Sequence, residues 1–87
     1  MISFLNSAPT HIHQGSKFTT FVYGDEMEVG SVITCVYSPF DQRGWRAVSF
    51  IRVLSGIPGV LASEFIAERV LTAEEIAHFE AMLPIAG

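Results

Sequence analysis

The sequence is short of cysteine, and it has no long apolar run. Cys35 is the single cysteine, so no disulfide can form within the chain, and a reducing compartment is the default expectation. Cys35 lies in the apolar run 31–37 and is predicted to be a buried packing residue. No segment approaches the roughly 18 apolar residues of a membrane span, and no basic-then-apolar leader opens the chain. These absences favour a soluble, cytoplasmic protein.

Positive charge is also scarce. Five lysines and arginines stand against nine aspartates and glutamates, which gives a net charge of −4. Binding of long nucleic acids depends on clustered Lys and Arg, so such a ligand is disfavoured, whereas a nucleoside or single nucleotide needs only a pocket. His11 and His13 would share a face only on a strand, and His78 is distant in sequence. We therefore expect no metal and no cofactor.

Apolar residues, by contrast, are abundant. They make up 49% of the 87 residues, while charged residues make up 16%. A chain of this size forms one domain, residues 1–87, that buries about 60–65% of its unfolded surface in one modest core. Low charge on so small a body leaves apolar surface, which predicts a homodimer contact or a protein partner covering an open edge.

Hydrophobic patterning predicts a mixed α+β domain. Strands are expected over residues 2–5, 17–23, 32–37 and 45–54. Helices are expected over residues 7–15, 60–69 and 72–82. The last helix starts with a capping box, formed by Thr72 and Glu75, and ends before Pro84. The sum is a set of mainly antiparallel strands with a short N-terminal helix and one or two C-terminal helices.

The segment 12–21 contains the only lysine of the chain, Lys17. Gly15 before it suits a turn, and hydroxyl and aromatic residues follow at strand-like spacing. The simplest interpretation is a solvated lysine at a helix-to-strand corner, because Lys is rarely buried unless paired. A site lysine is the alternative.

The order of these segments resembles the opening of ASCH domains, small open barrels of the PUA-like class. The matching pieces are the strand at 2–4, the pattern Ile12-x-x-Gly15-x-Lys17-x-x-Thr20, the strand entry at 28–33, the strand at 45–54 and the final helical region. The resemblance covers roughly residues 2–80. It is nearest to small bacterial ASCH proteins that hydrolyse N4-acetylcytidine to cytidine and acetate, and it implies an amidohydrolase that uses no metal.

The resemblance also implies a set of site residues. The family's catalytic lysine and threonine correspond to Lys17 and Thr20, and its glutamate to Glu68, with Glu64 as the fallback. The substrate-binding residues proposed with them are Gly15, Phe18, Arg46 and Arg52. Thr20 would act as nucleophile or as oxyanion donor. On an ideal strand Lys17 and Thr20 face opposite sides, so the pair requires a bend or bulge.

Two departures from the family keep other functions open. Val22 stands where the family usually has an arginine, and no apolar strand follows residue 80 to close the barrel. A non-catalytic module that binds a modified base, nucleotide or RNA is one alternative. A small acidic protein-interaction factor, such as an inhibitor or adaptor, is the other, because an uncovered edge strand invites pairing.

Overall fold

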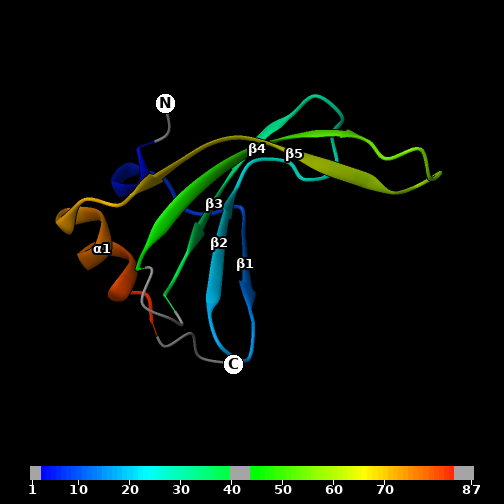
Figure 1. The fold of residues 1–87 in the computed structure, drawn as a ribbon. Coiled ribbons are helices and arrows are strands. Elements are labelled where there is room, and N and C mark those ends of the chain that lie inside the picture. The colour runs from blue at the N-terminus through cyan, green and yellow to red at the C-terminus, as the bar shows by residue number, and fades with distance from the viewer. Residues whose placement is uncertain (1–2, 40–43, 84–87) are drawn as a thin grey trace.

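A five-stranded antiparallel sheet forms the body of the molecule (Figure 1). The structure is a computed structural model that describes residues 3–39 and 44–83. The strands are β1 (His11–Gln14), β2 (Thr19–Tyr23), β3 (Val32–Tyr37), β4 (Arg46–Leu54) and β5 (Leu61–Val70). Each strand pairs with the next one in sequence, so β1 and β5 are the two edges. This arrangement confirms the α+β class with mainly antiparallel strands.

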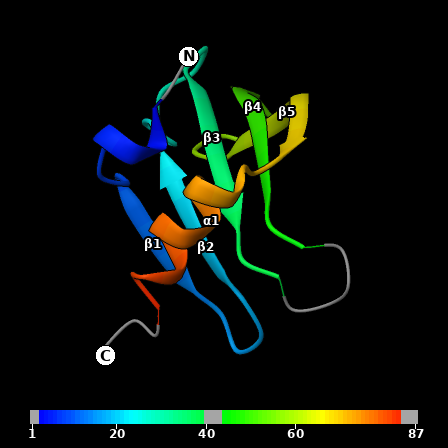
Figure 2. The same cartoon turned by 90° about the vertical axis from the view of Figure 1, so that its left-hand side faces the viewer.

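One face of the sheet is covered by two helices. The 3₁₀-helix η1 (Phe4–Asn6) precedes the sheet, and α1 (Ala73–Glu80) follows it and lies across the strands (Figure 2). Phe79 of α1 is fully buried and packs on Phe21 with ring centroids 5.0 Å apart. The main core on this covered face consists of Phe4, Phe21, Tyr23, Val36, Trp45, Ala47, Leu71 and Phe79.

The opposite face carries a second, smaller cluster. Val22, Ile33 and Cys35 are buried there, with Tyr37 and Phe50 packed against them. Within the described part of the chain, no helical residue belongs to this open face. Burial raises the pKa of the Cys35 thiol and raises the pKa of Tyr37 to about 12. The prediction that Cys35 is a packing residue is confirmed.

The predicted N-terminal helix over residues 7–15 is wrong. Residues 11–14 form β1, which pairs with β2 from His11–Val22 to Gln14–Thr19. Gly15 opens the turn between the two strands instead of ending a helix, because its amide donates to the Phe18 carbonyl at 2.9 Å. A short weak helix loses here to pairing with the β-prone segment 19–23. The strand predicted over residues 2–5 is also wrong in its described part, where residues 4–6 form η1.

The predicted helix over residues 60–69 is wrong as well, since this segment is β5. A bulge lies where Ser49 pairs with Ala67 and Phe50 with Phe65, so that Ile66 is the extra residue of β5. The bulge shifts the inside–outside alternation by one position and makes Phe65 and Ile66 consecutive apolar residues. That shift imitates helical spacing, which explains the error.

The remaining elements agree with the sequence. β2, β3 and β4 fall within the predicted strands, and α1 begins with the predicted capping box, in which the Glu75 amide donates to Thr72 Oγ1 at 3.2 Å. Among residues 3–39 and 44–83, α1 is the one α-helix, within the expectation of one or two C-terminal helices. Pro84 lies outside the described residues. No helix in the described part is long and apolar enough to cross a membrane.

Candidate functional site

The hairpin between β1 and β2 presents Lys17 at one end of the sheet. Gln14 and Thr19 are the last paired residues, and residues 15–18 form the connecting loop. A Cβ atom at Gly15 would lie 3.1 Å from the Phe18 carbonyl oxygen, a contact that is tighter than side chains normally make. Gly15 therefore allows the close turn that positions Lys17.

A cleft of about 620 Å³ opens beside this hairpin. Its walls are formed by Gln14, Gly15, Ser16, Lys17, Phe18, Thr19, Ser38, Pro39, Trp45, Glu80 and Leu83. The cleft thus joins the hairpin, the segment after β3, the residue before β4 and the C-terminal end of α1. Its volume lies within the range of small-molecule pockets, about 300–1,000 Å³.

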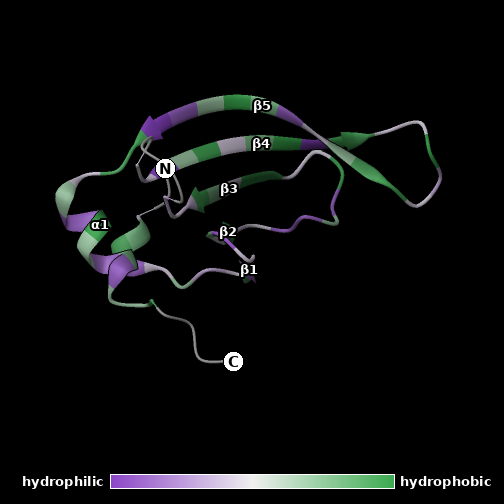
Figure 3. Ribbon diagram, turned by 60° about the horizontal axis from the view of Figure 1, so that its bottom comes forward, coloured by the Kyte–Doolittle hydropathy of each residue, from purple (hydrophilic) through white to green (hydrophobic). Residues whose placement is uncertain are grey.

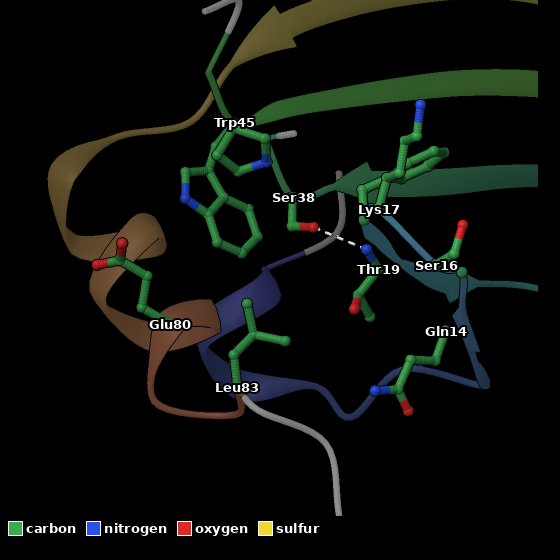
Figure 4. A pocket seen from close by; sticks show the side chains of 11 residues that line it. Gln14, Ser16, Lys17, Thr19, Ser38, Trp45, Glu80 and Leu83 are labelled. Atoms are coloured by element: carbon green, nitrogen blue, oxygen red, sulfur yellow. Dashed lines mark hydrogen bonds between the residues drawn. The ribbon is translucent and has the colours of Figure 1, made fainter. Parts of the chain in front are cut away.

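Ser38 and Thr19 hold the floor of the cleft in place. The Thr19 amide donates to Ser38 Oγ at 2.7 Å, and the Ser38 amide donates to the Thr19 carbonyl at 3.0 Å (Figure 4). Both residues are buried. Trp45 is 8% exposed and stacks on Phe79, with ring centroids 5.9 Å apart, so the rigid core fixes its position at the cleft wall.

The charged groups of the cleft do not contact each other. Figure 4 shows Glu80 and Trp45 on one side, while the Lys17 amine points away from both Glu80 and Leu83. Lys17 and Glu80 are both exposed, so their long side chains keep the rotamer freedom to turn toward a ligand. Lysine, hydroxyl, indole and carboxylate groups can therefore surround one bound molecule.

Three of the residues named from the sequence line this cleft: Gly15, Lys17 and Phe18. Glu68 does not, because it lines a separate hollow of about 470 Å³ near η1 and the strands β3 to β5. Its carboxylate is also 3.7 Å from Arg46 Nη1. Glu64, the fallback, pairs with Ile51 in the β4–β5 ladder and lines neither hollow.

Thr20 and the two arginines also lie away from the cleft. Thr20 neighbours Thr19 on β2 and therefore points to the opposite, open face. Arg46 pairs in register with Tyr37, which belongs to that face. Arg52 donates through Nε to the Glu26 carbonyl at 2.7 Å and through Nη1 to Ser63 Oγ. These contacts hold the Arg52 side chain between the β2–β3 turn and β5.

The structure adds functional candidates that the sequence analysis missed, chiefly Thr19, Ser38 and Glu80. Thr19 was detectable, because alternation on a strand starting at residue 19 puts Thr19 and Thr20 on opposite faces. Glu80 had no sequence signal, since only the packing of α1 across the sheet brings residue 80 to the hairpin. Ser38 had none either, because its place in the cleft depends on its hydrogen bonds with Thr19.

The histidines of β1 form a separate group on the open face. His13 Nε2 lies 3.3 Å from Glu26 Oε1, and His11 Nδ1 lies 3.6 Å from the same oxygen. As β1 is a strand, the two rings share a face and stack at 6.0 Å. Among the described residues, no three His, Cys, Asp or Glu side chains are arranged to hold a metal ion.

Comparison with protein-family models, with curated proteins and with solved structures finds no match to this chain.

Proposed function

We propose that the protein binds a pyrimidine nucleoside in the cleft beside Lys17. The observation that carries this proposal is the presence of Lys17, Thr19, Trp45 and Glu80 on the walls of one open cleft of about 620 Å³. A planar base needs an aromatic or apolar wall and a few fixed polar groups, and Trp45 with the Ser38–Thr19 pair offers both. The resemblance of residues 12–20 to ASCH domains supplies the nucleoside class.

Hydrolysis of an N4-acetyl group is the second candidate function. It is favoured by the presence of a lysine, a hydroxyl and a carboxylate on the walls of the same cleft. In this scheme the Glu80 carboxylate accepts a proton from a water that attacks the acetyl carbonyl carbon. The Lys17 ammonium stabilises the resulting oxyanion. Glu80 then returns the proton to the exocyclic N4 as the C–N bond breaks, which releases cytidine and acetic acid that ionises to acetate. In this scheme Thr19 replaces Thr20 as the hydroxyl residue of the site, and Glu80 replaces Glu68 as its carboxylate.

The same proposal has a consequence for the fold. We interpret the curved antiparallel sheet as an open form of the ASCH barrel, with α1 beside the hairpin that bears Lys17. The outer edge of β5 would then stand at the opening of the barrel.

The test measures binding and turnover separately. Cytidine and N4-acetylcytidine are titrated into the protein and followed by NMR chemical shifts, and released cytidine is measured by chromatography. Binding should shift the amide signals of residues 15–19, and Lys17→Ala should weaken it about tenfold, the equivalent of about 1.4 kcal/mol. Saturable binding without product supports the binding function alone.

A matched pair of variants then distinguishes the two carboxylates. If hydrolysis occurs, Glu80→Gln should abolish product release while Glu68→Gln leaves it intact, because Glu68 lies outside the cleft. The opposite result would restore Glu68 as the catalytic carboxylate. No shift at residues 15–19 with either nucleoside would refute the binding proposal.

A further inference from the structure

Strand β5 is a long, exposed edge. Its neighbour is β4 on one side only, and eight of its ten residues are exposed. Phe65, Ile66 and Val70 are 62%, 47% and 73% exposed, and Figure 3 shows hydrophobic residues along this outer strand. An edge that is long and apolar exposes unpaired backbone groups that can pair with another chain.

The β4–β5 register shows which backbone N–H and C=O groups of β5 point away from β4 and can pair with another strand. The Arg52 amide donates to the Ser31 carbonyl at 2.9 Å and its carbonyl accepts from Gly30, so the Arg52 backbone faces β3. Ser63, opposite Arg52, therefore turns its own N–H and C=O away from β4. By alternation through the ladder, the backbone groups of Phe65, Glu68 and Val70 point outward as well.

The charges of β5 are arranged about its bulge. Glu64 lies opposite Ile51 and Arg69 opposite Ala47, and Ile51 and Ala47 share a face of β4 because they are four residues apart. Glu64 and Arg69 therefore also share a face, although they are five residues apart. Without Ile66 as the extra bulge residue, the two would point to opposite faces.

We propose that β5 pairs antiparallel with β5 of a second copy of this chain, about a two-fold axis between Ile66 and Ala67. Glu64 then lies directly opposite the partner's Arg69, and the symmetry repeats this contact. Phe65 lies opposite the partner's Glu68 and Ser63 opposite the partner's Val70. Each of these residues has outward backbone groups, so each of these pairs can exchange two hydrogen bonds.

The bulge and the charges select this register. The two-fold axis sets residues 65–68 of one copy opposite the same residues of the other. The extra residue of each strand is therefore opposed by a segment of equal length, and the ladder stays in register on both sides of the bulge. Shifting one copy by a single residue sets outward backbone groups against inward ones and loses the hydrogen bonds. Registers that centre on Glu64, Glu68 or Arg69 place like charges opposite each other, which destabilises the pair.

The side chains of Glu64 and Arg69 remain accessible to a second copy of the chain. Among the described residues, Glu64 forms no ion pair. Arg69 binds Glu75 at 2.8 Å but its side chain is still 45% exposed. In the dimer, Arg69 lies between Glu75 of its own chain and the partner's Glu64. This self-complementarity points to a second copy rather than to an unrelated strand.

The experiment measures the mass of the full chain by analytical ultracentrifugation over a range of concentrations. The wild type should sediment as a dimer that dissociates on dilution. Glu64→Arg places an arginine opposite the partner's Arg69 and should raise the dissociation constant at least about tenfold. Glu28→Arg makes the same charge change in the exposed β2–β3 turn and should leave that constant unchanged. Circular dichroism checks that both variants are folded.

Amide exchange gives an independent measurement of the register. The outward amides of Phe65 and Glu68 should exchange slowly at high protein concentration and quickly at low concentration. If the wild-type chain remained a monomer at every concentration, the proposal would be overturned. This would hold even if the monomer bound a different protein. Equal weakening by Glu64→Arg and Glu28→Arg, or concentration-independent exchange at Phe65 and Glu68, would also overturn it.

Discussion

Arg69 and Glu75 join the last strand to α1 through one short network of polar contacts. Both guanidinium Nη atoms of Arg69 donate to the Glu75 carboxylate at 2.8 Å, and the Thr72 amide donates to the same carboxylate at 3.0 Å. The Arg69 guanidinium also lies 5.3 Å from the centre of the Phe4 ring. The hydrogen bonds from Arg69 lower the pKa of Glu75 to about 2.

Loss of the Glu75 charge should destabilise the protein in acid. The pKa of Glu75 is about 2 when folded and near 4.5 when unperturbed, so its stabilising effect is full above pH 4.5 and is lost as pH falls toward 2. Glu75→Gln should lower the free energy of unfolding by about 1–2 kcal/mol above this window and by much less near pH 2. Urea unfolding at several pH values measures the difference.

Glu74→Gln is the matched control for this prediction. It removes the same charge from the neighbouring, exposed position of the first helical turn. The variant should keep the wild-type decline in stability between pH 4.5 and 2. If Glu75→Gln also kept that decline in full, the Arg69–Glu75 contact would not be its cause.

At the scale of elements, the turn between β2 and β3 depends on Gly24. Its φ is +121°, a region that side chains rarely adopt. A Cβ atom there would lie 3.0 Å from the Val32 carbonyl oxygen and 3.1 Å from Ile33 Cγ2. The Gly24 amide also donates to Thr10 Oγ1 at 3.0 Å, which ties the chain before β1 to this turn.

Gly24→Ala should therefore be costly. We expect the free energy of unfolding to fall by about 1–3 kcal/mol, because backbone strain and a close contact act together. Gly59→Ala provides the comparison, since its φ is +77° but a Cβ atom would meet nothing within 4 Å. Its cost should be the smaller, about 1 kcal/mol, and urea denaturation compares the two variants. An equal or larger loss at Gly59 would contradict this account.

The edge strands show why element types could be misjudged from the sequence. Residues 11–14 are exposed at every position, so no apolar alternation marks them as a strand. In β5 the extra residue Ile66 breaks the alternation. In both cases the structure is determined by pairing with a neighbouring strand, a non-local interaction that local patterns do not record.

At the scale of the whole molecule, the packing is uneven. Phe21 and Val36 lie under α1 and are fully buried, whereas the hairpin between β4 and β5 extends beyond the helices (Figure 1). Residues at its tip, such as Leu54 and Ile57, are 75% and 63% exposed. Few buried contacts therefore hold this end of the sheet.

Hydrogen exchange should follow this gradient. The amides of Val53 and Ala62, which pair near the tip, should exchange at least about tenfold faster than those of Phe21 and Val36, the equivalent of about 1.4 kcal/mol in opening free energy. NMR exchange at a concentration below dimer formation measures these rates. Equal rates at all four amides would mean that the sheet opens only as one unit.

Features that depend on local chemistry were predictable from the amino-acid sequence. The capping box of α1, the buried strand with Cys35 and the alternating strand β4 depend on residues that are adjacent or regularly spaced. For Lys17 the local residues predicted only a solvated corner lysine, and its interpretation as a site residue came from the resemblance of residues 12–20 to ASCH domains.

The side chains that share the cleft with Lys17 depend on packing between segments that are distant in the sequence. Glu80 reaches the cleft because Phe79 anchors α1 on the sheet, and Glu68 is excluded because the bulge and pairing of β5 place it against Arg46. The choice of β1 and β5 as strands, and the complementarity of Glu64 and Arg69, likewise depend on cross-strand register. Register and packing arise from contacts between distant segments, so their outcome cannot be deduced from the spacing of residues along the chain.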